Sequence, residues 1–290
     1  MTSKAPLRLG TRGSELAVTQ SQLVADAVTE ATGVSVELVI ISTKGDRIKN
    51  VPLPAIGGKG LFTAELEAAL HDGSIDFAVH SLKDLPTDDP VGLVLGAIPR
   101  REDPRDCLVG PALAELGNGA RVGSGSLRRR EQLLKLRSDL QVEDIRGNVH
   151  TRLEKRDRGD FDATILAMAG LSRLGIERID MHPLGIDMMV PAVGQGALAV
   201  QCRGDDQRVL ALLTTIDDEE TRACVSGERA FLAEFGGGCN VPAGCHVVKE
   251  DESFRLYAFV AKPSGECICI EQEGQNPIDL GLAAAKMALA

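Results

Sequence analysis

The chain has 290 residues and a formal net charge of −10 at pH 7, from 42 acidic side chains against 32 Lys and Arg. This length is enough for two or three domains. The negative charge, together with the absence of Trp and the presence of one Tyr, argues against a general nucleic-acid binder, which needs a positive surface and stacking rings.

The opening residues, MTSKAPLRLG, lack the apolar segment of an export signal. No window of the sequence approaches the roughly 18 continuous apolar residues of a membrane-spanning helix. We therefore expect a cytoplasmic protein without a membrane partner. Any binding of anions must come from a local concentration of Arg and Lys.

The N-terminal part of the chain alternates short apolar runs with helical periodicity. Ser14 precedes a helical pattern and is the expected N-cap, because a hydroxyl there accepts an N–H of the first turn. We expect strands at 7–10, 35–42, 75–79 and 93–98, helices at 14–31 and 63–72, and a charged segment that crosses between domains at 99–106. This order is typical of an α/β domain.

The same alternation begins again and predicts a second α/β unit. Expected are strands at 120–123, 141–145 and 162–167, helices at 126–137 and 148–158, and then a strand at 192–202 and a helix at 206–215 that return to the first unit. The pattern then changes to a long helix from Glu219, strands at 254–261 and 266–271, and a final helix at 279–289. We expect this last part to be a small α+β domain.

The stretch VGSGSLRRREQLL, at 122–134, places arginines where a helix begins. A strand that ends in Gly-Ser-Gly-Ser and opens a helix presents free N–H groups to an anion. Arg128, Arg129 and Arg130 lie in the first turn, where each positive charge costs roughly 0.3 to 1 kcal/mol. A bound anion would compensate them. The alternative is a solvated basic face paired with residues such as Glu131, which suits Arg130 best.

A second basic cluster lies in DIRGNVHTRLEK, where Arg146 and Arg152 flank a Gly-Asn turn that opens the next helix. Ligands of doubly wound sheets gather at the carboxyl ends of the strands. Arg146 and Arg152 are therefore expected to converge with Arg128 and Arg129 on one crevice. Guanidinium groups bind carboxylates or phosphates in two-point contacts, so the expected ligand is one of these anions.

Polar side chains follow the predicted strands of the first unit in the same way: Arg12, Ser14, Lys59, Ser81, Lys83 and Asp84. A cleft lined by cations from both units implies a substrate with several negative charges. Among these cations, Asp84 can stabilise a positive charge that develops on the substrate, or move a proton. Its alternative role is a surface ion pair or a turn before Pro86. Glu102, Asp103 and Asp106 are expected to form interdomain ion pairs.

The cysteines stand at Cys107, Cys202, Cys224, Cys239, Cys245, Cys267 and Cys269. An odd number in a reducing compartment argues against a disulfide scaffold. A zinc site from Cys239, Cys245, His246, Cys267 and Cys269 is an alternative, but the spacings are not those of zinc knuckles, so we expect no metal.

Cys239 has an unusual setting, GGGCNVPAG. The glycines leave room around its sulfur, and Pro242 stiffens the exit from the loop. A buried inert thiol is the common role of a cysteine. Since a thiolate is a good covalent tether, we instead expect a bulky group to be attached to Cys239.

Together and in this order, HSLKDLP, GSGSLRRR, RGNVHTRL, PAVGQGA and ERAFLAEFGGGCNVPAG resemble the porphobilinogen deaminase, or hydroxymethylbilane synthase, family. The resemblance runs from about Leu7 into the last domain. It implies two type II periplasmic-binding-protein-like α/β domains with a hinged cleft, and a small α+β C-terminal domain. The implied boundaries are 1–98 with 197–216 for domain 1, 99–196 for domain 2 and 217–290 for domain 3.

The resemblance also implies a reaction. Four porphobilinogen molecules are joined head to tail, with release of ammonia, to give hydroxymethylbilane on a dipyrromethane cofactor attached to Cys239 by a thioether. Asp84 matches the catalytic aspartate of the family. The matching cofactor-binding positions are Lys59, Ser81, Lys83, Ser126, Arg128, Arg129 and Arg146, and the matching substrate-binding positions are Arg12, Ser14, Arg152, Arg173 and Gln195. A monomer is implied, with neither a nucleic acid nor a membrane as partner.

The sequence departs from the family pattern in three places. Ala55 stands where many relatives have a lysine, Gly125 replaces a hydroxyl residue, and the chain ends soon after its last helix. We expect these changes to weaken affinity rather than alter the chemistry. A rival interpretation is a solute-binding or effector-sensing module for small carboxylates with the same fold. Cys239 and the third domain argue against it, because a simple binding module needs neither.

Overall fold

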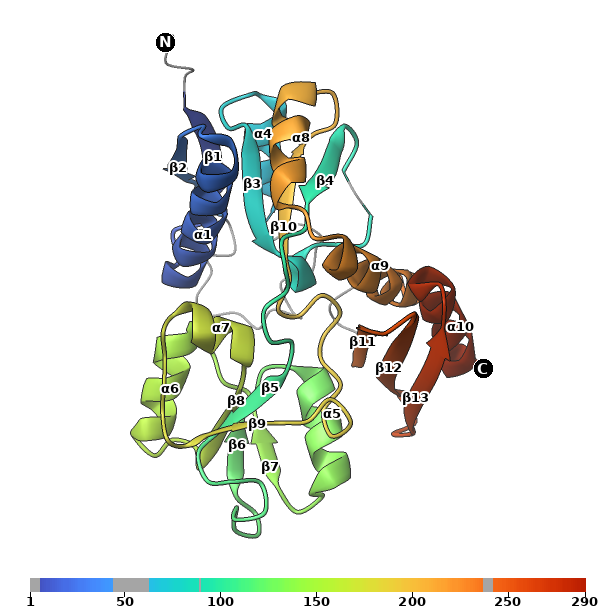
Figure 1. Ribbon diagram of the computed structural model, residues 1–290. Coiled ribbons are helices and arrows are strands. Elements are labelled where there is room, and N and C mark those ends of the chain that lie inside the picture. The colour runs from blue at the N-terminus through green and yellow to red at the C-terminus, as the bar shows by residue number, and fades with distance from the viewer. Residues whose placement is uncertain (1–5, 44–62, 89, 237–241) are drawn as a thin grey trace. The chain divides into compact units, whose positions relative to one another are not determined.

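The structure is a computed structural model that describes residues 6–43, 63–88, 90–236 and 242–290 (Figure 1). The chain forms two compact units, one of Met1–Arg101 with Ala197–Arg222 and the other of Glu102–Gly196 with Ala223–Ala290. The sequence predictions for Ala55, Lys59 and Cys239 fall outside the described residues.

The first unit is built on a five-stranded sheet with helices on both faces. The strands, in spatial order, are β2 (Val36–Ile40), β1 (Leu7–Thr11), β3 (Phe77–Ser81), β10 (Leu198–Arg203) and β4 (Leu93–Ala97). β2, β1 and β3 run parallel, whereas β10 runs antiparallel to both of its neighbours. Side chains of α1 (Glu15–Thr32) and α8 (Gln207–Leu213) form the core on one face, and those of α4 (Ala64–His71) form a second core.

The first helix begins where the sequence predicts. The Ser14 hydroxyl accepts the N–H of Ala17 at 3.3 Å, so Ser14 is the N-cap of α1. The helix ends at Gly33, whose φ of 69° lies in the left-handed region that glycine adopts without strain. These two caps set the length of α1 and leave Arg12 in the turn between β1 and the helix.

The second unit contains a five-stranded sheet of matching design. Its strands, in spatial order, are β7 (Gln141–Glu143), β6 (Arg121–Gly123), β8 (Ala163–Ala167), β5 (Asp106–Val109) and β9 (Met181–Pro183). β6 runs parallel to β7 and β8, and β5 runs antiparallel to β8 and β9. One core packs against α5 (Leu127–Leu136), and another against α6 (Val149–Asp157) and α7 (Met168–Arg173). Both sheets thus place an antiparallel strand fourth, after three parallel ones.

A three-stranded antiparallel sheet forms the C-terminal part of the second unit. It consists of β11 (Ala243–Glu250), β12 (Ser253–Ala261) and β13 (Cys267–Gly274). α9 (Glu219–Ala233) and α10 (Pro277–Leu289) pack on it through buried side chains such as Phe231 and Ala284. The expected α/β class, with two sheets of matching design and a small α+β part, is confirmed.

Some predicted elements were wrong in extent, and others were missed. The strand expected at 192–202 begins only at Leu198, since Gly194 and Gly196 have φ of 70° and 88°, which a strand does not allow. β5, β9 and β11 were not predicted. β9 is only three residues long, β5 follows a highly charged stretch, and β11 follows the glycine-rich loop directly, so each lacks a clear apolar alternation.

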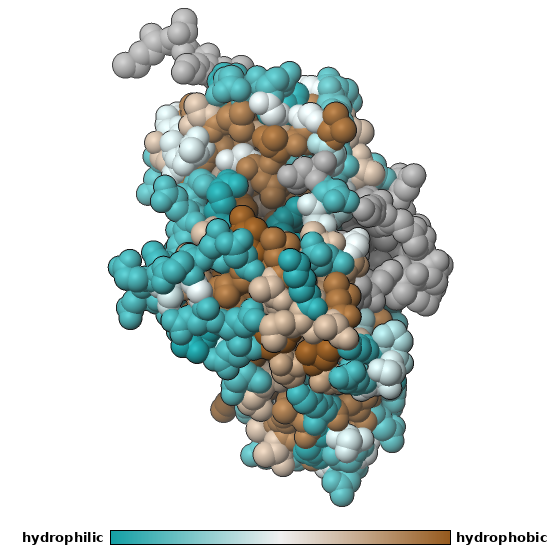
Figure 2. All heavy atoms as spheres, turned by 90° about the vertical axis from the view of Figure 1, so that its right-hand side faces the viewer, coloured by the Kyte–Doolittle hydropathy of each residue, from teal (hydrophilic) through white to brown (hydrophobic). Residues whose placement is uncertain are grey.

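The surface mixes polar and apolar residues. On the face drawn in Figure 2, apolar side chains are interspersed with polar ones. Fully exposed apolar residues such as Ile179 and Val91 occur on loops, as they do in most folded proteins. Among the described residues, no helix is long and apolar enough to cross a membrane.

Two glycines allow α9 and α10 to approach closely. A Cβ at Gly281 would overlap the carbonyl oxygen of Gly227 and lie 3.1 Å from the backbone nitrogen of Phe231. We predict that Gly281→Ala lowers the free energy of unfolding by about 1 to 3 kcal/mol, because the helix backbones must separate. Gly117→Ala is the control, since nothing lies within 4 Å of the added atom. Chemical denaturation measures both, and equal effects would contradict this packing.

Candidate functional site

The topology of the second sheet brings three segments to one edge. β6 and β7 are parallel neighbours, so the turns that follow Gly123 and Glu143 emerge side by side. β5 is antiparallel to β8, and its first residue, Asp106, pairs with Ala167, the last residue of β8. Asp106 therefore lies at the carboxyl edge of the sheet, next to the start of α5.

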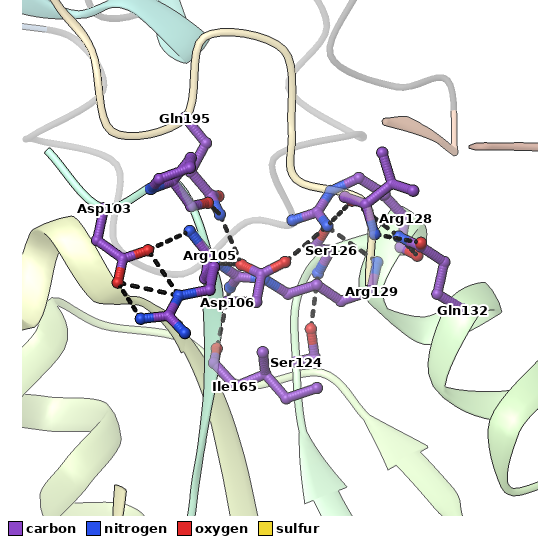
Figure 3. A network of polar contacts seen from close by, with 12 residues as sticks. Asp103, Arg105, Asp106, Ser124, Ser126, Arg128, Arg129, Gln132, Ile165 and Gln195 are labelled. Carbon is purple, nitrogen blue, oxygen red and sulfur yellow. Dashed lines mark hydrogen bonds and ion pairs between the residues drawn. The ribbon is translucent and has the colours of Figure 1, made fainter. Parts of the chain in front are cut away.

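Asp106 binds both arginines of the α5 first turn (Figure 3). Its Oδ2 accepts a hydrogen bond from Arg128 Nη1 at 2.7 Å, and its Oδ1 accepts bonds from Arg129 Nε at 3.0 Å and Nη2 at 2.7 Å. The Gln195 amide also donates to Oδ1, at 2.8 Å. The carboxylate has no exposed surface, and both arginines are buried.

The electrostatics of this cluster favour its charged state. Burial by itself raises the pKa of Asp106, but the adjacent Arg128 and Arg129 outweigh it and hold the pKa far below the usual range of a carboxyl group. Asp106 is thus ionised at every physiological pH. Two buried guanidinium groups face one carboxylate, so the cluster keeps a positive charge.

Two further arginines, Arg146 and Arg152, lie at this edge, and Arg146 is paired with Asp144. Arg152 is half-buried in α6, and its Nε donates to the Gly147 carbonyl at 2.8 Å. Burial, followed by the charges of Arg129 and Arg146, lowers the pKa of Arg152 to about 10, against a smaller opposing effect of Asp144. Three arginines therefore repel one another at this edge, which is the expected condition of a site that binds anions.

Asp144 reaches this site because residue 125 is glycine. The Asp144 carboxylate accepts a bond from Arg146 Nε at 3.1 Å. A Cβ at Gly125 would lie 2.8 Å from Asp144 Oδ1. A hydroxyl residue at position 125 would displace the Asp144 carboxylate and so disturb its hydrogen bond with Arg146. Gly125, which departs from the family pattern, thus leaves room for the Asp144 carboxylate that bonds Arg146.

In the first unit, buried leucines set the direction of Lys83 and Asp84. After β3 the chain makes one turn of 3-10 helix, Leu82–Asp84, closed by a hydrogen bond from the Leu85 N–H to the Leu82 carbonyl at 3.1 Å. Leu82 and Leu85 are both buried. This spacing leaves Lys83 half-buried and turns Asp84 to solvent, at the carboxyl end of a central strand.

Arg12 follows β1, and Ser81 is the last residue of the neighbouring strand β3. β1 and β3 are parallel and paired, so the residues after them share one edge. Ser81 Oγ donates to the side-chain oxygen of the buried Gln20, on α1, at 3.2 Å. Ser14 caps α1 beside Arg12. The first unit thus brings together Arg12, Ser14, Ser81, Lys83 and Asp84 at one edge of its sheet, as expected.

The other predicted residues have clear places. Ser126 is the N-cap of α5, and Arg173 Nη2 donates to the Gly196 carbonyl at 2.6 Å. Arg130 is exposed, and its Nε lies 3.9 Å from the Glu131 carboxylate, which confirms the solvated role suggested for it.

The expected interdomain ion pair of Asp106 was wrong, because its partners lie within the same α/β part as itself. Among the described residues, no group of three or more His, Cys, Asp and Glu is placed to hold a metal ion.

Sequence reasoning missed two residues that support this site. For Asp106 the sequence predicts only an interdomain ion pair, as for the other acids of PRREDPRD. The apolar run CLVG directly after it was the signal of a buried strand, whose first side chain would then lie at the sheet edge. Gln20 gave no signal, since a glutamine within a helical pattern is ordinary.

Comparisons with known proteins agree with this arrangement. The family model described as "Porphobilinogen deaminase, dipyromethane cofactor binding domain" matches residues 7–211, and that described as "Porphobilinogen deaminase, C-terminal domain" matches residues 222–290. The chain belongs to the porphobilinogen deaminase family. The resemblance seen in the motifs is thereby confirmed.

Curated relatives match over nearly the whole chain. The porphobilinogen deaminase of Brevibacillus brevis is 48% identical over 289 residues, which are 98% of this chain and 94% of the relative. That of Roseiflexus castenholzii is 46% identical, over 98% of this chain and 95% of its own. The matched lengths include both the arginine edge of the second unit and the segment that holds Asp84.

His80, on β3 beside Ser81, makes the stability of this porphobilinogen deaminase family member depend on pH. Burial, the largest cause, and the charge of Arg12 lower the pKa of His80 from 6.5 to about 4, against an opposing effect of the Gln201 side chain. Between these two pH values the unfolded chain binds the proton and the folded chain does not. Stability is therefore complete above pH 6.5 and falls as the pH drops towards 4.

We predict that this histidine alone costs about 3 kcal/mol of unfolding free energy between pH 7 and pH 4. In His80→Gln the decline over this range should be smaller by that amount. Urea unfolding at several pH values measures it. Parallel pH profiles of the two proteins would show that His80 is not held neutral by the fold.

Proposed function

We propose that this chain joins four porphobilinogen molecules head to tail, with loss of ammonia, to give hydroxymethylbilane. Membership of the family supports this activity. The arginine edge of the sheet in the second unit supports it as well, because burial and the charges of Arg129 and Arg146 lower the pKa of Arg152 there. Each porphobilinogen carries two carboxylates. Carboxylates bound at this edge relieve the repulsion among the arginines, which is why an acidic protein binds an acidic substrate.

The residues present fit a dipyrromethane cofactor. Such a group carries four carboxylates, and the second unit offers Arg128, Arg129, Arg146 and Arg152 near the N-termini of α5 and α6. Guanidinium groups bind carboxylates by paired, charge-assisted hydrogen bonds. When bound, the cofactor supplies a pyrrole carbon that starts the chain. We propose that Cys239 holds it by a thioether and that Lys59, Ser81, Lys83 and Ser126 complete its binding.

Asp84 is the proposed catalytic residue. Loss of ammonia leaves a positive charge on the substrate pyrrole and its methylene group. Asp84 is an exposed carboxylate fixed by the buried Leu82 and Leu85, so it can meet this charge without rearrangement of the backbone. Arg12, Ser14, Arg152 and Arg173 are the proposed substrate contacts, whereas the buried Gln195 acts on the site through Asp106. The match of the C-terminal family model to residues 222–290 favours this enzyme over a simple solute-binding module.

The last part of the proposal concerns the domains, the oligomeric state and the location of the protein. We propose three domains, 1–98 with 197–216, 99–196 and 217–290, which act as a cytoplasmic monomer. The net charge of −10 supports the absence of a nucleic-acid partner.

Asp84→Asn should lower kcat by roughly 10²- to 10³-fold, because the amide keeps the shape of the side chain but loses the charge that meets the cation. Ammonia release and product formation from porphobilinogen measure it. Asp88→Asn is the matched control, an exposed carboxylate four residues further along, and should keep wild-type turnover.

Intact-protein mass separates loss of chemistry from loss of cofactor. The wild-type chain should carry the extra mass of one dipyrromethane, and Cys239→Ala should have only the mass of its sequence. Wild-type turnover by Asp84→Asn, or by Cys239→Ala, would contradict the proposed mechanism.

A further inference from the structure

Asp106 has a role in the carboxylate-binding site that goes beyond balancing charge. Its two oxygens accept four hydrogen bonds, three from Arg128 and Arg129 and one from Gln195, at 2.7 to 3.0 Å. The carboxylate is completely buried. A substrate or cofactor therefore has no access to Asp106, and any effect of this residue on binding acts through the arginines.

Each arginine is held at a second point. Arg129 Nη1 donates to the Ile165 carbonyl at 2.9 Å, so three of its nitrogens are engaged, two by Asp106 and one by the strand β8. Arg128 Nη1 donates to both Asp106 and the Val190 carbonyl. The planes of both guanidinium groups are thereby set by fixed parts of the second unit, as Figure 3 shows.

The orientation of Arg129 matters because its charge acts on Arg152, whose pKa it helps to lower. A long, flexible side chain would otherwise move away from its positive neighbours. Asp106 prevents this movement and yet neutralises only one of the two arginines it binds. The result is a positive site that is organised before the ligand arrives, which lowers the cost of binding.

We propose that Asp106 is the positioning residue of this site: it holds Arg129, with Arg128, in the orientation that binds the carboxylates of the cofactor and of the growing pyrrole chain. The proposal rests on the proposed function. Gln195 supports Asp106 in this, since its amide nitrogen bridges the Asp106 Oδ1 and the Pro104 carbonyl, each at 2.8 Å. A purely structural role would change the stability of the chain without changing its affinity for carboxylates.

The exchange of Asp106 for Glu separates position from charge. Glu keeps the charge but moves the carboxylate by one methylene, so the hydrogen bonds to Arg129 cannot all be kept. We expect the KM for porphobilinogen to rise by about tenfold or more with a smaller change in kcat. The fraction of chains that carry dipyrromethane, measured by intact mass, should fall. Asp106→Asn keeps the position but loses the charge and turns one acceptor into a donor that faces a guanidinium group, so it should show larger changes in both readouts.

Leu133→Ala is the matched control. Leu133 is buried on the same helix and contacts the core of the sheet, so its loss lowers the melting temperature without touching the arginines. It should keep the wild-type KM and cofactor content. A wild-type KM and full cofactor content in Asp106→Glu would overturn the proposal. So would KM changes in Leu133→Ala as large as those in Asp106→Glu, because they would follow from instability alone.

If neither Asp106 variant folds, the residue serves the fold itself and the proposal fails. Failure of the proposed function is seen separately, as wild-type protein that makes no hydroxymethylbilane from porphobilinogen.

Discussion

The buried ion pair of Asp106 with Arg128 and Arg129 is the interaction on which the second unit depends. It joins the first residue of β5 to the first turn of α5, and through Arg129 to the middle of β8. Removal of one partner of such a pair leaves an uncompensated buried charge, at a cost of about 3 to 5 kcal/mol. The arginines of this sheet edge are therefore held in fixed positions by a pair that is costly to break.

This rigidity explains how an acidic protein can present a positive site. Charges on a mobile surface would be screened and would move apart. Here Arg129 is locked by Asp106, and Arg152 is half-buried and bonded to the Gly147 carbonyl, so the repulsion between them is retained. Binding of a carboxylated ligand recovers this energy. In the first unit the buried Leu82 and Leu85 hold Asp84 in place, because they fix the backbone on both sides of this exposed carboxylate.

Much of the fold and part of the site could be predicted from sequence. Local signals were sufficient for the cap at Ser14 and for the start of the helix expected at 126–137, because a helix start is decided within about four residues. Asp106 could not be assigned, since its partners are more than 20 residues away and only the position of β5 beside β8 brings them together. The strand expected at 192–202 begins only at Leu198 because two glycines before it are left-handed, a conformation that the sequence does not reveal. Family motifs assigned the chemistry, but only the structure shows that a buried carboxylate orients the arginines.

An experimental structure of the chain isolated with its cofactor attached tests the central claim most directly. The account predicts carboxylate oxygens of the cofactor at hydrogen-bond distance, about 2.7 to 3.2 Å, from the guanidinium groups of Arg146 and Arg152, with the pair between Asp106 and Arg129 unchanged. A cofactor whose carboxylates are bound elsewhere, while Arg152 contacts no anion, would contradict it.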